Sequence, residues 1–298
     1  MIRFLAKVGV QQVLGAIPLG TDIYGLLQRH LTKSTEPDRE SVLGKAAEAD
    51  NYIERIAALG IPAGLCRLHV DIGAGWLPTI PLVLHARGVE RQILFDLYPL
   101  MRMDAAMGAA AILEEAIGAR FPAPQSDASL DGWLGRMGIR YTAPAMPPYD
   151  LPSGSADLVT CSAVLMHPDS SGCKAIYAEA ARLLRPGGVF IATIRHDDQY
   201  ADSDPTLSRY NFLRYGQKTW SRWFHNRFTP FNRLRPADHR ELLADLPLDV
   251  VTWSIEGGDA ADLLEFGRIK VHPDFAKYPV SELTARQLTM VLQRREEL

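Results

Sequence analysis

The chain has 298 residues, of which 47% are hydrophobic and 22% charged, and its formal net charge is -3. These values are ordinary for a folded, soluble protein, so they indicate neither a disordered chain nor a membrane protein. The near-neutral charge also argues against a nucleic-acid-binding protein. Cys66, Cys161 and Cys173 include no CxxC pair and no zinc-type spacing, so we expect no metal and a reducing, cytoplasmic compartment.

Residues 1–62 are expected to form a helical cap that packs outside the following sheet. Apolar positions over residues 2–31, broken in the middle by glycine and proline, predict two short helices with a bend. Asp38 and Glu40 then open a longer helix that runs to about Leu59. Such helices could cover a functional site or build a homodimer, and the sequence favours neither.

From Arg67 onward, strands and helices alternate. A short apolar strand, LHVDI, ends in a glycine-rich turn, and a second strand, QILFD, follows a helix over residues 81–88. This order predicts a right-handed crossover between parallel strands. The same alternation continues through a helix over residues 102–120 and a short one over 130–137. It then includes strands at IRY, ADLVTCS and VFIATI, the last reached from a helix over residues 172–184 through the turn RPGG.

The end of the chain is expected to complete the same sheet. A helix over residues 236–245, the strand VVTWS and a last strand near residues 288–293 favour an antiparallel hairpin at the sheet edge. Residues 63–298 therefore predict one α/β domain, a doubly wound Rossmann-like fold with a mostly parallel seven-stranded sheet.

An aromatic-rich insertion interrupts this pattern at about residues 196–235, directly after the fifth strand. We interpret it as a lid over a site, because long insertions at the carboxyl ends of strands often carry function. Its aromatic side chains could hold a cation by cation–π attraction or wall off an apolar substrate. The alternative is an ordinary small core beneath a long insertion.

The motif VDIGAGW lies where the first strand gives way to a helix. Gly73 and Gly75 allow backbone N–H groups to approach a ligand closely, although a tight turn in any α/β protein can also need glycine. Asp96 ends the second strand, where a carboxylate can bind the two hydroxyls of a ribose. Pro78 stands where pyrophosphate-binding motifs have a third glycine. This disfavours a nicotinamide or flavin enzyme and favours a nucleoside without phosphates.

From Arg67 to Ile194 the chain resembles the class I S-adenosylmethionine-dependent methyltransferases. VDIGAGW is similar to the glycine-rich first motif of the family, and Asp96 in ILFDL to its ribose-binding acid. LPSGSADLVTCSAVLMH and AARLLRPGGVFIAT are similar to the motifs of the fourth and fifth strands.

The resemblance implies S-adenosylmethionine as cofactor. It assigns the methionyl part to Asp71, Gly73 and Gly75 and the ribose to Asp96, with Leu97 beside it. The family's acid after the third strand is missing here, so Met146 is the expected adenine contact. The remaining expected cofactor contact, at the end of the fourth strand, is Ser162.

Three side chains are candidates for acceptor chemistry. His167 follows the fourth strand and could take a proton from a nucleophile, or could simply begin a helix. His196 and Tyr200 follow the fifth strand, at the edge of the sheet where ligands bind in this fold class. A metal site at His196 would need partners that the sequence does not supply.

We therefore expect a methyltransferase that acts on a small molecule at nitrogen, oxygen or carbon, with no membrane or nucleic-acid partner. One alternative keeps the cofactor but attacks its aminobutyryl chain and releases methylthioadenosine. Other readings are a non-catalytic cofactor-binding protein and a nicotinamide-dependent oxidoreductase.

Overall fold

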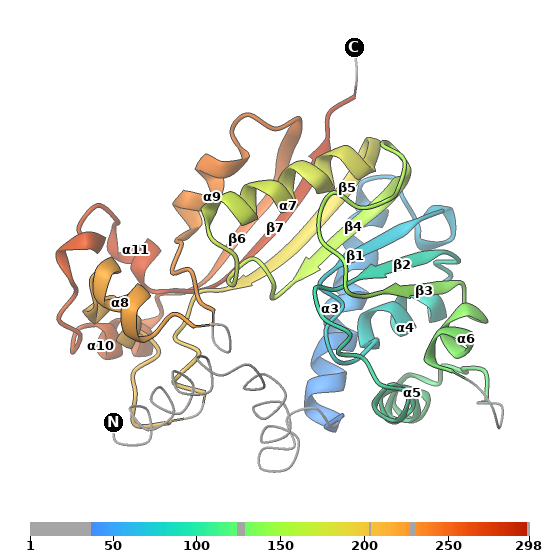
Figure 1. The fold of residues 1–298 in the computed structure, drawn as a ribbon, viewed down its shortest axis with the longest axis horizontal. Coiled ribbons are helices and arrows are strands. Elements are labelled where there is room, and N and C mark those ends of the chain that lie inside the picture. The colour runs from blue at the N-terminus through green and yellow to red at the C-terminus, as the bar shows by residue number, and fades with distance from the viewer. Residues whose placement is uncertain (1–36, 124–128, 203, 227–229, 297–298) are drawn as a thin grey trace.

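We describe residues 37–123, 129–202, 204–226 and 230–296 of a computed structural model of the chain. Within these ranges, a seven-stranded sheet with the order β3-β2-β1-β4-β5-β7-β6 crosses the molecule (Figure 1). The strands are β1 His69–Ile72, β2 Gln92–Phe95, β3 Ile139–Thr142, β4 Ala156–Ser162, β5 Leu184–Arg195, β6 Leu248–Gly257 and β7 Ala285–Arg294. The first five pair in parallel, and β7 pairs antiparallel with both β5 and β6. The predicted fold class, with its edge hairpin, is confirmed.

Helices cover both faces of the sheet. They are α3 Arg39–Ala58, α4 Thr79–Ala86, α5 Met103–Ile117, α6 Leu130–Gly135, α7 Ser170–Leu183, α8 Gln217–Trp223, α9 Pro236–Leu243, α10 Ala260–Phe266 and α11 Val280–Leu283. Figure 1 shows α7 and α9 on one face and α3, α4 and α5 on the other. Each face has its own apolar core, as the alternation of side chains along a strand requires. None of the described helices is long and apolar enough to cross a bilayer.

The longer helix expected near the N-terminus is present as α3, while the two helices expected over residues 2–31 lie outside the described residues. The Asp38 side chain caps α3 by accepting a hydrogen bond from the backbone N–H of Ser41 at 2.8 Å. Val42, Ala49 and Ile56 are buried in the core of the sheet face that α3 covers. Because α3 lies directly on the sheet, its polar side chains can reach the strand ends.

A lobe beside β5 and β7 is built from two parts far apart in the sequence, the described residues of 196–235 (196–202, 204–226 and 230–235) and residues 258–284 (Figure 1). The expected insertion forms only the first half. The second half, between β6 and β7, packs on it through the ring pairs Tyr210–Phe266 and Phe212–Phe275. The backbone N–H of His272 also donates to the carbonyl of Leu213 at 2.8 Å.

The connection from α7 to β5 differs from the expected free turn. The chain pairs with β4 from Leu184 onward, and the register then shifts before Val189. Gly187 adopts a positive φ of 74°, and Gly188 has backbone atoms of Arg185 and Ala156 within 3.0 Å of the position of a Cβ. The RPGG sequence therefore forms the irregular first part of β5.

Candidate functional site

The turn after β1 lies where the parallel strands end, and its two glycines have different roles. Gly73 has a φ of +86°, and the side chain of Val164 occupies the space that a Cβ would need there. Gly75 has a φ of +68°, but no atom lies within 4 Å of its Cβ position. The first glycine therefore lets the turn pack against the loop after β4, and the second keeps open space beside the turn.

Asp96 is nearly buried at the end of β2 and holds this turn in place. Its carboxylate accepts hydrogen bonds from the backbone N–H groups of Gly75 at 2.8 Å and Tyr98 at 3.0 Å. Leu97 is 45% exposed beside it. Met146 is 66% exposed in a loop that is tied to β2 by a hydrogen bond from the Ala145 N–H to the Asp96 carbonyl at 2.8 Å. The predicted ribose acid thus stands next to exposed apolar side chains suited to contact a base.

Asp71 is buried at the end of β1, and an oxygen of its carboxyl group lies 2.7 Å from the Thr160 hydroxyl oxygen. Nε2 of His69 lies 2.7 Å from the same hydroxyl, and Nδ1 of His69 lies 2.9 Å from Oε1 of Gln92. Burial raises the pKa of Asp71 to about 6 and lowers that of His69 to about 4. Asp71 therefore belongs to a buried polar chain that crosses three strands.

A polar cluster of five side chains connects α3 with the ends of β4 and β5. The Glu48 carboxylate accepts hydrogen bonds from Ser162 at 2.7 Å, from Thr193 at 2.9 Å and from Tyr52 at 2.5 Å. Lys45 donates to Glu48 at 2.7 Å and to Ser162 at 2.6 Å. We call these residues, Lys45, Glu48, Tyr52, Ser162 and Thr193, the α3 cluster. Within it, four donors compensate the negative charge of Glu48.

The α3 cluster keeps Glu48 ionised although the carboxylate is mostly buried. Burial alone would raise the pKa of Glu48, but the charge of Lys45 and the hydrogen bonds from Lys45, Tyr52 and Ser162 outweigh it. The pKa therefore lies below its ordinary value. The side chains of Lys45 and Glu48 remain 40% and 19% exposed, so the ion pair is accessible at the sheet edge.

Sequence reasoning missed Lys45, Glu48 and Tyr52, although a signal was present. The three side chains follow one another at intervals of three and four residues within a predicted helix, in register with the buried positions Val42 and Ala49. Charged residues on the apolar stripe of a helix are unusual, because burial of a charge needs a partner. Here the partners are strand ends more than 110 residues away.

His167 lies in the loop after β4. Its Nδ1 is 2.7 Å from the carbonyl of Pro230, and a carbonyl can only accept, so Nδ1 carries the proton of the neutral ring. Burial lowers the pKa of His167, so the ring is neutral at pH 7 and Nε2 can accept a proton. The backbone carbonyl of Pro230 therefore fixes the orientation and the tautomer of this histidine.

His196 and Tyr200 lie inside the protein, away from the α3 cluster. His196 is 1% exposed beside His239 and Arg235, and burial lowers its pKa well below the ordinary value. Tyr200 is also 1% exposed, and its hydroxyl donates to the carbonyl of Phe224 at 2.7 Å. Neither side chain presents a surface to an acceptor in this conformation.

The aromatic side chains of the insertion pack mainly on one another, which is the arrangement of an ordinary small core. Tyr200 and Trp220 meet edge to face at 6.4 Å, and Phe212 and Phe231 at 5.3 Å. The guanidinium of Arg233 lies 4.9 Å from the Trp220 ring and 5.1 Å from the Phe275 ring, so this buried cation contacts two aromatic faces.

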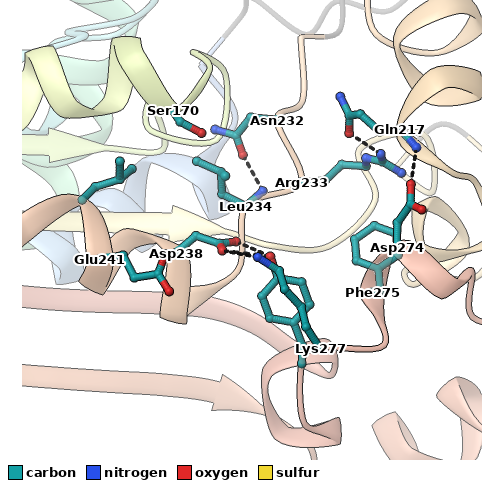
Figure 2. A pocket seen from close by; sticks show the side chains of 12 residues that line it. Ser170, Gln217, Asn232, Arg233, Leu234, Asp238, Glu241, Asp274, Phe275 and Lys277 are labelled. Carbon is teal, nitrogen blue, oxygen red and sulfur yellow. Dashed lines mark hydrogen bonds and ion pairs between the residues drawn. The ribbon is translucent and has the colours of Figure 1, made fainter.

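A cavity of about 570 Å³ opens between the start of α7, helix α9 and residues 272–278 (Figure 2). Its lining combines charged groups of both signs. Arg233 donates to Gln217, and Asp238 accepts from the Tyr278 hydroxyl at 2.7 Å. Within the described ranges, its lining includes none of the site residues that the sequence predicts. No three His, Cys, Asp or Glu side chains gather as a metal-binding group in the same ranges.

Comparison with known proteins gives a domain match over part of the chain and a shared fold. The methyltransferase domain family matches residues 125–192. No curated protein sequence matches the chain. Among solved structures, a protein of Galdieria sulphuraria described as a sarcosine dimethylglycine methyltransferase has 13% identity and a TM-score of 0.50, with 85% of this chain and 87% of that chain covered. Geranyl diphosphate C-methyltransferase from Streptomyces coelicolor A3(2) has 14% identity and a TM-score of 0.49, covering 86% and 83%.

The domain match lies on β3, β4, α7 and most of β5, so it includes the strand that ends at Ser162. The resemblance of the motifs from Arg67 to Ile194 also includes β1 and β2. Residues 125–192 are therefore similar to the methyltransferase domain family, and the described residues share the fold of a solved methyltransferase.

Proposed function

We propose that this enzyme transfers the methyl group of S-adenosylmethionine to a small-molecule acceptor that binds beside the α3 cluster. The observation that carries this proposal is the position of Lys45 and Glu48 on the ends of β4 and β5. In doubly wound sheets, ligands bind at the carboxyl ends of the strands. Helix α3 covers the carboxyl ends of β4 and β5, which favours an acceptor small enough to fit beside a helix.

The residues at the strand ends fit the cofactor. The empty space over Gly75 leaves room for a ligand that approaches the backbone, and a Cβ would fill part of it. Each oxygen of Asp96 accepts one backbone N–H and has a further lone pair for a ribose hydroxyl. Exposed Leu97 and Met146 supply apolar contact for the adenine, and Asp71 and Ser162 remain for the methionyl part.

When bound, S-adenosylmethionine supplies an activated methyl group that a nucleophile attacks in line. The protein then mainly holds the acceptor in position and excludes water. Lys45 and Glu48 offer one group of each charge to orient a polar acceptor. Neutral His167, oriented by Pro230, is the proposed base where the acceptor must lose a proton.

Incubation of the purified chain with S-adenosylmethionine and small amine, hydroxyl and activated-carbon acceptors tests this function. We expect S-adenosylhomocysteine to form only when a suitable acceptor is present. Formation of methylthioadenosine from the cofactor alone would contradict methyl transfer. Calorimetric titration with S-adenosylmethionine tests the cofactor assignment independently of the acceptor.

Variants of α3 test the acceptor position. Glu48→Gln and Lys45→Met are expected to raise the KM for the acceptor about tenfold or more, while the Kd for S-adenosylmethionine changes less. Glu54→Gln is a matched control on the exposed side of the same helix. If Glu48→Gln and Glu54→Gln change the KM for the acceptor equally, the acceptor does not bind beside the α3 cluster.

A further inference from the structure

The buried chain of Gln92, His69, Thr160 and Asp71 has one hydrogen-bond acceptor too many. The amide nitrogen of Gln92 donates to the Pro81 carbonyl at 2.8 Å, and a carbonyl can only accept. The amide oxygen of Gln92 must therefore face Nδ1 of His69, at 2.9 Å, and Nδ1 must carry a proton. In a neutral ring, this leaves Nε2 as an acceptor.

Thr160 then lies between two acceptors with a single hydroxyl proton. Its oxygen is 2.7 Å from Nε2 of His69 and 2.7 Å from the Asp71 carboxylate. Both contacts are hydrogen bonds only if the chain holds one more proton, either on Nε2 or on Asp71. His69 is fully buried with no carboxylate in contact, and burial disfavours the imidazolium, so the proton belongs on Asp71.

We propose that His69, acting through Thr160, favours the protonated form of Asp71 in the free enzyme, and that this proton passes to solvent when S-adenosylmethionine binds. The inference rests on the proposed placement of the methionyl part beside Asp71. The α-ammonium and sulfonium groups are cations, and a nearby cation favours the ionised carboxylate. Asp71 thus becomes an anion when a cation is there to pair with it. His69 is a positioning residue that acts on Asp71 through Thr160.

The other groups around Asp71 fit this arrangement. Those with a charge or a titratable group are Lys45, Glu48 and Tyr52 of α3, Asp96, Tyr149 and Cys161. Glu48 and Asp96 disfavour a further negative charge in the free enzyme, and Lys45 partly opposes them. Burial and these carboxylates bring the pKa of Asp71 to about 6, so its proton is present in part of the molecules near that pH.

The protonation of His69 can be measured in the free enzyme. Nitrogen NMR of histidine-labelled protein is expected to show a neutral ring protonated at Nδ1, with Nε2 accepting, at pH 7. A ring protonated at Nε2 would overturn the proposal, because Nε2 could then donate to Thr160, and Thr160 to an ionised Asp71.

Proton release on binding is measured by calorimetric titration with S-adenosylmethionine at pH 6 in buffers of different ionisation enthalpy. The observed enthalpy is expected to vary linearly with the buffer enthalpy, with a slope of roughly half to one proton released. At pH 8 the slope should fall to near zero. A slope of zero at both values with clear binding would overturn this inference alone, whereas absence of binding would overturn the proposed function.

The variant His69→Gln tests whether His69 controls the protonation of Asp71. The new amide can donate a hydrogen bond to the Thr160 hydroxyl oxygen, so the Thr160 hydroxyl can donate to an ionised Asp71. The chain then needs no additional proton on Asp71. We expect proton release at pH 6 to fall at least fivefold, with the Kd at pH 8 within a few-fold of the parent value. His239→Gln changes a buried histidine on the other face of the sheet and should leave the release intact. Equal release in His69→Gln and the parent would refute the role of His69.

Discussion

The side chain of Val164, in the loop after β4, occupies the space that a Cβ on Gly73 would require. This contact joins the turn after β1 to the loop after β4, the two loops that border the proposed cofactor position. Gly73 is therefore required by packing within the protein, as well as by its φ of +86°. Gly75, two residues later, also has a positive φ, but no atom lies within 4 Å of its Cβ position. The roles of the two glycines can therefore be distinguished by experiment.

Gly75→Ala is expected to abolish cofactor binding while the fold survives. A left-handed alanine costs about 1–2 kcal/mol, and its methyl group would stand in the space assigned to S-adenosylmethionine. Gly60→Ala is the matched control, because Gly60 has a φ of +82°, no atom near its Cβ position and a place outside the site. Both variants should show similar unfolding free energies, and calorimetry should show lost binding only for Gly75→Ala. Equal binding by both would contradict the cofactor position.

Asp96→Asn should weaken the binding of S-adenosylmethionine at least tenfold, which is about 1.4 kcal/mol. The amide can still accept one backbone hydrogen bond, so the turn is retained, but the paired carboxylate oxygens for the ribose are lost. Asp150→Asn, an exposed aspartate after the third strand, serves as control. If calorimetry gives the same Kd for both variants, the ribose assignment fails.

The buried histidines make the enzyme sensitive to acid. Burial lowers the pKa of His239 from 6.5 to about 4, so between these values the unfolded chain binds a proton that the folded chain does not. Stability from this group is therefore complete above pH 6.5 and is lost as the pH falls toward 4, by about 1.4 kcal/mol per pH unit. Asp71 and Asp198, whose pKa values are raised to about 6, act in the opposite sense.

Comparison of the parent with His239→Gln cancels those other groups. The free energy of unfolding in urea, measured from pH 7 to 4.5, should fall less steeply in the variant by about the slope of one histidine. Tyr177→Phe removes the hydrogen bond to His239 Nδ1 and keeps the titrating ring, so it should retain the parent slope. A variant slope equal to that of the parent would show that His239 is protonated equally in both states.

Arg235→Met should destabilise the lobe by about 3 kcal/mol or more. The guanidinium is fully buried and donates to three carbonyls, those of Glu282 at 3.0 Å, His196 at 3.0 Å and Ala285 at 2.9 Å. Methionine fills similar space but leaves all three acceptors unpaired. Arg240→Met, which removes an exposed arginine 4.4 Å from the Trp253 ring, should cost less than about 1 kcal/mol. Denaturant unfolding compares the two variants.

The sequence predicted the sheet well because strand and helix periodicity are local signals. The β6–β7 hairpin was identified from its apolar pattern, and Asp38 marked the start of α3. The second segment of the lobe was not predicted, since residues 258–284 contain short helices and loops without a strong period. Their attachment to residues 196–235 depends on contacts between distant segments, such as Ser208 with Glu265.

The site was predictable only in part, for the same reason. Gly75 and Asp96 lie in motifs whose spacing implies a ligand. Glu48 meets Ser162 and Thr193 across 114 and 145 residues, and the local pattern of α3 indicates only that its charged residues need partners, not which residues those are. His196 followed a strand end as expected, but the direction of its side chain, toward His239, depends on the packing of the lobe.

The way α3 is fastened to the sheet has a consequence for motion. One oxygen of Glu48 accepts hydrogen bonds from Ser162 of β4 and Thr193 of β5, so lifting the helix breaks both bonds at once and leaves the carboxylate only its partners on α3, Lys45 and Tyr52. If only one of these bonds breaks, the other still holds the helix on the sheet. We therefore expect this end of α3 to open in one step rather than to fray residue by residue. Amide hydrogen exchange of α3 should follow a single opening constant, which a bound ligand at the strand ends would lower for the whole helix.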